Sequence, residues 1–296
     1  MEPAPAIPIH FSEGNQIGLY VCLGLVMFGV ALGLRKETLF SVFRKPKGLI
    51  VGLAAQCILL PAITLLTVWL MRPSPGIACG MFLVAAVPGG NVSNFICKIA
   101  GGNVALSVGL TVVSTLTAIF VTPLNFAFWS SFYAPVHDLR ATFDIGILQT
   151  AETILYLTVI PVSAAMLLTY LKPRFSEKLE KPMNTFSGIL FTAFVVAAFL
   201  QNKDAFVQFA GRAFMYVFLM NAAGFVASLY FARLTGISKP EQKTVSIETG
   251  IQNAGMALVL ILQFFDANGE AALTAAIWGI WHIIAGTVWG IVLRRY

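Results

Sequence analysis

Two short polar stretches interrupt long apolar segments of this chain, and they decide its fold. The first reads PGGNVSN at residues 88–94, and the second reads ETGIQN at residues 248–253. Each lies within an apolar run of roughly the 20 residues that an α-helix needs to span a bilayer. Proline removes a backbone hydrogen bond and glycine loosens the chain, so the first stretch predicts a broken membrane helix. About 11 residues of helix, or about 16 Å, precede it, which places the break near the middle of the membrane. The second stretch gathers an acid, two amides and a glycine, and it predicts a similar interruption.

The composition of the chain is that of an all-α polytopic membrane protein. Of its 296 residues, 58% are apolar and only 11% are charged, whereas soluble domains carry about 25% charged residues. This composition excludes an ordinary soluble enzyme and a disordered protein, and 4 cysteines are too few for a disulfide scaffold. The net charge of +6 comes from basic residues in short loops, which membrane topology explains without a nucleic-acid partner.

Apolar runs bounded by charges, proline and glycine predict about nine transmembrane helices in a single transmembrane domain, residues 1–296. The predicted spans are roughly residues 17–34, 48–71, 76–99, 104–132, 144–171, 183–201, 212–234, 241–265 and 270–293. The loops after odd-numbered spans, with the C-terminus, hold 15 of the 19 Lys and Arg, and the other 4 lie on the opposite side. Positive charge marks the cytoplasmic side. We therefore expect a multi-pass protein of the cell (inner) membrane, with its N-terminus outside and its C-terminus in the cytoplasm.

The pair of breaks predicts coupled transport. Interruptions at corresponding places in the two halves of a chain are typical of transporters built from inverted repeats. The N-terminal ends of half-helices attract anions, and carbonyls freed by a break bind Na⁺. A channel, an intramembrane enzyme and a non-transporting sodium or ligand sensor are the competing classes. The sequence holds no Asp pair, no H-E-x-x-H motif and no G-x-S-x-G motif, so we do not expect an enzyme.

An acid inside a membrane span needs a partner, because an isolated charge there costs at least about 2.5–3.5 kcal/mol. Glu248 lies within a predicted span, and no Lys or Arg is assigned to the interior of any span. A bound cation is the simplest partner, and a protonated, hydrogen-bonded glutamate is the alternative. Oxygen ligands suit Na⁺ better than a transition metal. Glu152, the other acid within a predicted span, is either an acid near the outer interface or a residue of a transport pathway.

Three motifs resemble the bile acid:sodium symporter family. They are PGGNVSN at residues 88–94, GNVALSVGLTVVST at 102–115 and ETGIQNAG at 248–255, and the resemblance spans roughly residues 26–293. It implies inverted repeats and two broken helices that cross in a core domain, which moves against a panel domain. The panel helices would be residues 17–34, 144–171 and 183–201, and the core helices residues 48–132 and 212–293.

The resemblance also implies an activity and its residues. The chain would import an organic anion, either a bile acid or a smaller carboxylate, together with two Na⁺ ions by alternating access. We expect no obligate protein partner. The ligands of the first ion would be the side chains of Ser93, Asn94, Ser107, Thr111 and Glu248. Those of the second would be Gln56, Glu248 and Gln252, with the carbonyls of Thr249 and Ile251. The substrate positions would be Asn91, Asn253 and His282. Asn91 is often Thr in the family, so the substrate stays open.

Overall fold

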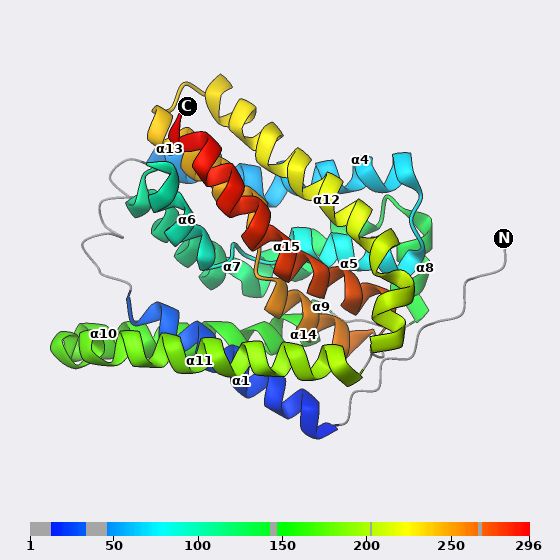
Figure 1. The fold of residues 1–296 in the computed structure, drawn as a ribbon, viewed down its shortest axis with the longest axis horizontal. Helices are drawn as coiled ribbons and strands as arrows, with labels where there is room; N and C mark the ends of the chain where they lie inside the picture. The colour runs from blue at the N-terminus through cyan, green and yellow to red at the C-terminus, as the bar shows by residue number, and fades with distance from the viewer. Residues whose placement is uncertain (1–12, 34–45, 143–146, 202, 266–267) are drawn as a thin grey trace.

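The computed structural model describes residues 13–33, 46–142, 147–201, 203–265 and 268–296, which form a bundle of helices without a named strand (Figure 1). Five helices in this part of the chain are long and apolar enough to cross a membrane: Pro46–Met71, Val104–Ser130, Leu148–Leu171, Gly211–Leu234 and Gly269–Arg294. Three shorter apolar helices, Tyr20–Gly29, Pro75–Ala86 and Ala254–Phe264, add to them. The chain is therefore a multi-pass membrane protein.

The helices follow one another along the chain as predicted, with local differences. In chain order they are α1 (Glu13–Ala31), α3 (Pro46–Ala54), the π-helical turn η1 (Ala55–Leu59), α4 (Leu60–Met71), α5 (Pro75–Ala86), α6 (Val92–Ala100), α7 (Val104–Ser130), α8 (Ala134–Thr142), α9 (Ile147–Ile154), the π-helical turn η2 (Leu155–Val159), α10 (Ile160–Leu171), α11 (Pro173–Gln201), α12 (Lys203–Leu234), α13 (Lys239–Gly250), α14 (Ala254–Phe264) and α15 (Gly269–Arg294). Residue 34 and residues 144–146, which bound two predicted spans, lie outside the described residues.

Both predicted breaks are present. Helix α5 ends at Ala86 and α6 begins at Val92, and α13 ends at Gly250 and α14 begins at Ala254.

Helices α11 and α12 begin about ten residues before the predicted spans of residues 183–201 and 212–234, and α8 was not predicted. The reason is the same in each case. An apolar run marks only the part of a helix that lies within the membrane. The polar residues on either side of the run continue the helical backbone hydrogen bonds, so the helix is longer than the run.

Two predicted spans contain a π-helical turn where a regular helix was expected. The Leu60 N–H donates to the Ala55 carbonyl, and the Ile160 N–H donates to the Leu155 carbonyl, each five residues back. Each turn is followed by a proline, Pro61 or Pro161, which has no N–H to continue the regular pattern. Single π-turns of this kind are frequent at functional sites. In this chain, the first turn carries Gln56.

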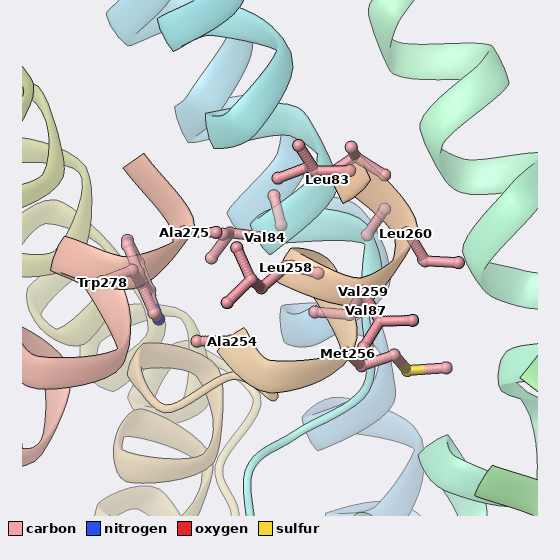
Figure 2. Close-up of a cluster of buried hydrophobic side chains, with 14 of the residues drawn as sticks. Leu83, Val84, Val87, Ala254, Met256, Leu258, Val259, Leu260, Ala275 and Trp278 are labelled. Carbon is pink, nitrogen blue, oxygen red and sulfur yellow. The ribbon is translucent and has the colours of Figure 1, made fainter. Parts of the chain in front are cut away.

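The helices pack in two groups. Helix α1 packs against α10, α11 and η2, and these helices lie together along the lower edge of Figure 1. Helix α12 packs against α4, α13 and α15, and α15 packs against α5, α6 and α14. Figure 2 shows the centre of the second group, where side chains of α5, α14 and α15 meet in one apolar cluster. Its members include Leu83 and Val84 of α5, Leu258 of α14 and the fully buried Trp278 of α15.

Candidate functional site

The two breaks lie against each other and pair through their backbones. Gly89 and Gln252 form an antiparallel bridge. The Gly90 N–H donates to the Ile251 carbonyl at 2.9 Å, and the Asn253 N–H donates to the Pro88 carbonyl at 2.9 Å. Unpaired backbone groups are costly away from water, so mutual pairing allows both helices to break inside the protein. Four helix ends, those of α5, α6, α13 and α14, therefore meet at one crossing.

The Glu248 carboxylate lies at this crossing, fully buried near the end of α13. It accepts hydrogen bonds from the hydroxyls of Ser107 and Thr111, the latter at 3.3 Å, and these residues lie one turn apart on α7. The Ser107 hydroxyl also lies 2.8 Å from the Asn94 Oδ1 of α6, and Ser93 is fully buried beside it in the sequence. Among the described residues, hydroxyl and amide groups rather than a lysine or arginine surround this carboxylate.

Two glutamine side chains point their amide nitrogens at carbonyls of α13. The Gln56 Nε2 donates to the Glu248 carbonyl at 3.1 Å, and the Gln252 Nε2 donates to the Thr249 carbonyl at 2.9 Å. The Oε1 atoms of both glutamines are buried and accept no hydrogen bond from any described residue. Buried polar atoms are nearly always paired, so two unpaired acceptors beside a buried carboxylate point to a missing partner. Such oxygens are what a hard cation binds.

Glycine is required at both positions of the first break because the second break comes so close. A Cβ on Gly89 would lie 2.9 Å from Gln56 Nε2 and 3.1 Å from Glu248 Oε2. A Cβ on Gly90 would lie 2.9 Å from the Gln252 carbonyl oxygen. Gly89 therefore leaves open the space between the amide of Gln56 and the carboxylate of Glu248.

The expected substrate positions fall in different places. Asn91 lines a narrow cavity together with Met27, Thr111 and Thr115. The Asn253 Nδ2 lies 3.6 Å from the Met27 sulfur, while its Oδ1 accepts from the Met256 N–H and caps α14. Asn91 and Asn253 thus both lie near α1.

The remaining expected residues lie apart from this cavity. His282 is buried on α15, and no described residue pairs with its Nδ1, but it is not among the residues that line the cavity. Glu152 has an exposed side chain on α9. The structure therefore brings the predicted ion ligands together more closely than the predicted substrate contacts.

Sequence reasoning missed Asn221, which supports the second break. Its side chain is fully buried on α12, and its Nδ2 donates to the Gly250 carbonyl at 2.7 Å. This bond satisfies one of the carbonyls that the end of α13 leaves without a helical donor. The available signal was a lone amide in the apolar run of residues 212–234, a residue type that marks a specific contact inside a membrane.

The fold and the site define a class of protein: a multi-pass helical membrane protein in which two broken helices meet at a buried, oxygen-lined crossing. A family model described as the sodium bile acid symporter family matches residues 20–209 of this chain. The chain belongs to this family, as the motifs of residues 88–94, 102–115 and 248–255 predicted. Its members are sodium-dependent transporters and not enzymes.

The chain is similar along most of its length to named relatives. It is 30% identical over 268 residues to the "Uncharacterized sodium-dependent transporter YocS" of Bacillus subtilis (strain 168), an alignment covering 90% of this chain and 80% of the relative. It is 30% identical over 306 residues to the "Probable sodium/metabolite cotransporter BASS1, chloroplastic" of Arabidopsis thaliana, covering 98% and 73%. Its identity to the human "P3 protein" is 27% over 260 residues, covering 85% and 52%.

Proposed function

We propose that this protein is a symporter that imports an organic anion together with two Na⁺ ions by alternating access. The observation that carries the proposal is the crossing itself. A fully buried carboxylate, two hydroxyls and two unpaired amide oxygens converge there, and the glycine at position 89 keeps the space between them open. This set offers oxygen ligands and one negative charge to a cation.

Each ion has a proposed set of ligands. The first ion takes the side chains of Ser93, Asn94, Ser107, Thr111 and Glu248. The second takes Gln56, Glu248 and Gln252 with the carbonyls of Thr249 and Ile251. Those two carbonyls already accept one hydrogen bond each, from Gln252 and Gly90. A carbonyl oxygen has two lone pairs, so each retains one for the ion. Glu248 serves both ions, which couples their binding.

The two groups of helices supply the moving parts. We assign α1, α9, η2, α10 and α11 to the panel and the remaining long helices to the core. The cavity beside Asn91 lies where Met27 of α1 and Val162 of α10 face Thr111 and Thr115 of α7. We place the organic anion there, next to the first ion, with Asn253 at its edge and His282 contributing only in another conformation. One relative carries the name of a sodium/metabolite cotransporter, and this name favours a small metabolite anion over a bile acid.

The energetics support two ions rather than one. Moving one charge through 100 mV is worth about 2.3 kcal/mol, and a tenfold gradient adds about 1.4 kcal/mol per ion. Two Na⁺ ions supply roughly 7.4 kcal/mol, and carrying a monovalent anion inward against the potential costs about 2.3. About 5 kcal/mol remains, enough for three to four decades of accumulation. One ion would leave only about one decade of accumulation.

The proposed orientation has the N-terminus outside the cell membrane and the C-terminus in the cytoplasm.

Flux in proteoliposomes tests this proposal. Radiolabelled organic anions of increasing size are offered with an inward Na⁺ gradient, with K⁺ replacing Na⁺ in the matched control, while current is recorded. We expect Na⁺-dependent uptake of at least one anion with net inward positive charge. Electroneutral uptake of a monovalent anion would contradict the two-ion stoichiometry. Binding of Na⁺ and an anion without any flux would identify a sensor and overturn the symporter assignment.

A further inference from the structure

Helix α13 holds the turn between α6 and α7 with two consecutive residues. The Lys243 Nζ donates to the carbonyl of Ala100, the last residue of α6, at 3.2 Å. The Thr244 hydroxyl accepts a hydrogen bond from the Asn103 N–H, just before α7 begins, at 2.8 Å. The same hydroxyl donates to the Pro240 carbonyl, one turn back on α13, at 2.9 Å. Thr244 is fully buried and belongs to neither of the proposed ligand sets.

The turn between α6 and α7 approaches Thr244 so closely that it requires glycine. Gly101 has a φ of 69°, in the left-handed region that favours glycine. A Cβ on Gly102 would lie 2.7 Å from the Cys97 Sγ and 2.9 Å from the Thr244 Oγ1. The Cys97 Sγ itself lies 3.1 Å from that hydroxyl. A side chain at position 102 would therefore push the turn away from α13.

Thr244 and Asn103 lie one helical turn before two residues of the proposed ion site. Glu248 follows Thr244 by four residues on α13, and Ser107 follows Asn103 by four residues along α7. Residues four apart share one face of a helix and are separated by about 6 Å along its axis. The hydrogen bond from Asn103 to Thr244 and the one from Ser107 to Glu248 are thus two successive contacts between the same two helices.

The second of these contacts joins two residues near helix ends. Glu248 lies two residues before α13 ends at Gly250, and Ser107 lies in the first turn of α7, which begins at Val104. Backbone groups near a helix end lack some of the hydrogen bonds that fix the middle of a helix. The groups of a binding site must be held within about 0.5 Å of the productive geometry. The alignment of Ser107 with Glu248 therefore depends on a contact outside the ion site.

We propose that Thr244 is a positioning residue that aligns Ser107 with Glu248 and thereby sets the Na⁺ affinity of the first ion site. It acts through the backbone of Asn103 and touches no ion. Without its hydroxyl, the start of α7 can shift along α13. The turn itself stays folded, because the Asn103 N–H keeps a second acceptor, the Pro240 carbonyl at 3.2 Å. The inference rests on the proposed sodium coupling.

Binding of radiolabelled Na⁺ to the purified whole protein tests this role. Thr244→Val keeps the shape of the side chain without its hydroxyl, and Thr244→Ser keeps the hydroxyl. We expect the half-saturating Na⁺ concentration to rise about fivefold in Thr244→Val, the effect of one lost neutral hydrogen bond, and to stay as in the wild type in Thr244→Ser. Thr244→Ala, which adds no bulk, replaces Thr244→Val if that variant does not purify as folded protein.

Thr64→Val is the matched control, because it removes a fully buried threonine hydroxyl that bonds the Leu60 carbonyl within α4. We expect it to bind Na⁺ as the wild type does. An equal loss of affinity in Thr64→Val and Thr244→Val would overturn the positioning role, because any buried hydroxyl would then have the same effect. Wild-type affinity in Thr244→Val would also overturn it.

The double variant Thr244→Val with Ser107→Ala shows whether Thr244 acts through Ser107. Residues that share one interaction are not additive, so we expect the double variant to bind Na⁺ as weakly as Ser107→Ala alone. A double variant whose loss is the product of the two single losses would contradict the inference. A wild-type protein without Na⁺-specific binding would instead refute the proposed function.

Discussion

The hydroxyl of Ser107 donates a hydrogen bond to the carboxylate of Glu248, two residues 141 positions apart in the sequence. This bond ties the first turn of α7 to the last turn of α13 before its break. A neutral donor on a buried acid leaves the negative charge in place. The same carboxylate can therefore hold hydroxyl donors in the absence of an ion and bind a cation when one arrives.

Removing that hydroxyl is expected to weaken sodium binding. In Ser107→Ala, the half-saturating Na⁺ concentration for uptake should rise about tenfold, the equivalent of roughly 1.4 kcal/mol, which is typical of a lost bond to a charged group. Uptake measured against Na⁺ concentration checks this. Ser131→Ala is the control, because that hydroxyl bonds the Phe128 carbonyl at the exposed end of α7. An unchanged Na⁺ dependence in Ser107→Ala would remove Ser107 from the ion site.

A methyl group at position 89 should fill the space proposed for the ions. Gly89→Ala would place a Cβ about 3 Å from both Gln56 Nε2 and Glu248 Oε2, so we expect Na⁺-dependent uptake and Na⁺-specific stabilisation to be lost. In Gly211→Ala the new Cβ meets nothing within 4 Å, and this variant should keep both while gaining up to about 1 kcal/mol of helix propensity. Wild-type behaviour of Gly89→Ala would show that the ions bind elsewhere.

The sequence predicted the two helix breaks, but not the backbone and side-chain geometry around them. The two breaks and Glu248 were visible because proline, glycine and an acid are conspicuous in apolar runs. The π-turn at Gln56 was not, because Pro61 is compatible with either a kink or a wider turn and only packing decides. Asn221 was missed because its partner, the Gly250 carbonyl, is a backbone group 29 residues away. Which helix ends meet is a property of the folded chain, and no local pattern encodes it.

The amide of Asn253 caps α14, and we propose that it also borders the bound anion; one pair of variants separates these two roles. Its Oδ1 caps α14 through the Met256 N–H. Asn253→Ala should lose about 1 kcal/mol of stability with the cap, whereas Asn253→Asp keeps an acceptor there. If the amide also borders the bound anion, Asn253→Asp should raise the KM for the anion at least tenfold through like-charge repulsion. Thermal melts and uptake kinetics measure the two effects, and a KM unchanged in both variants would exclude the substrate role.

Asn221 is expected to hold the second break in shape. Asn221→Asp keeps the volume but loses the donor to the Gly250 carbonyl, which should destabilise the protein by about 1–3 kcal/mol and weaken the response to Na⁺. Ser228→Ala on the same helix is the comparison, because its hydroxyl bonds only the Gly224 and Phe225 carbonyls within α12. Equal melting temperatures for Asn221→Asp and the wild type would show that the break does not depend on α12.

The central claim is that Glu248 binds Na⁺, and thermal stability of the purified protein in NaCl against KCl of equal ionic strength tests it most directly. A ligand present at 100 times its Kd stabilises the folded state by about 2.7 kcal/mol, which for a protein of this size means a rise of roughly 5 °C. We predict a saturable rise specific to Na⁺ in the wild type and in Glu152→Gln, and no such rise in Glu248→Gln. Identical curves in Na⁺ and K⁺ for the wild type, or a full Na⁺ response in Glu248→Gln, would contradict it.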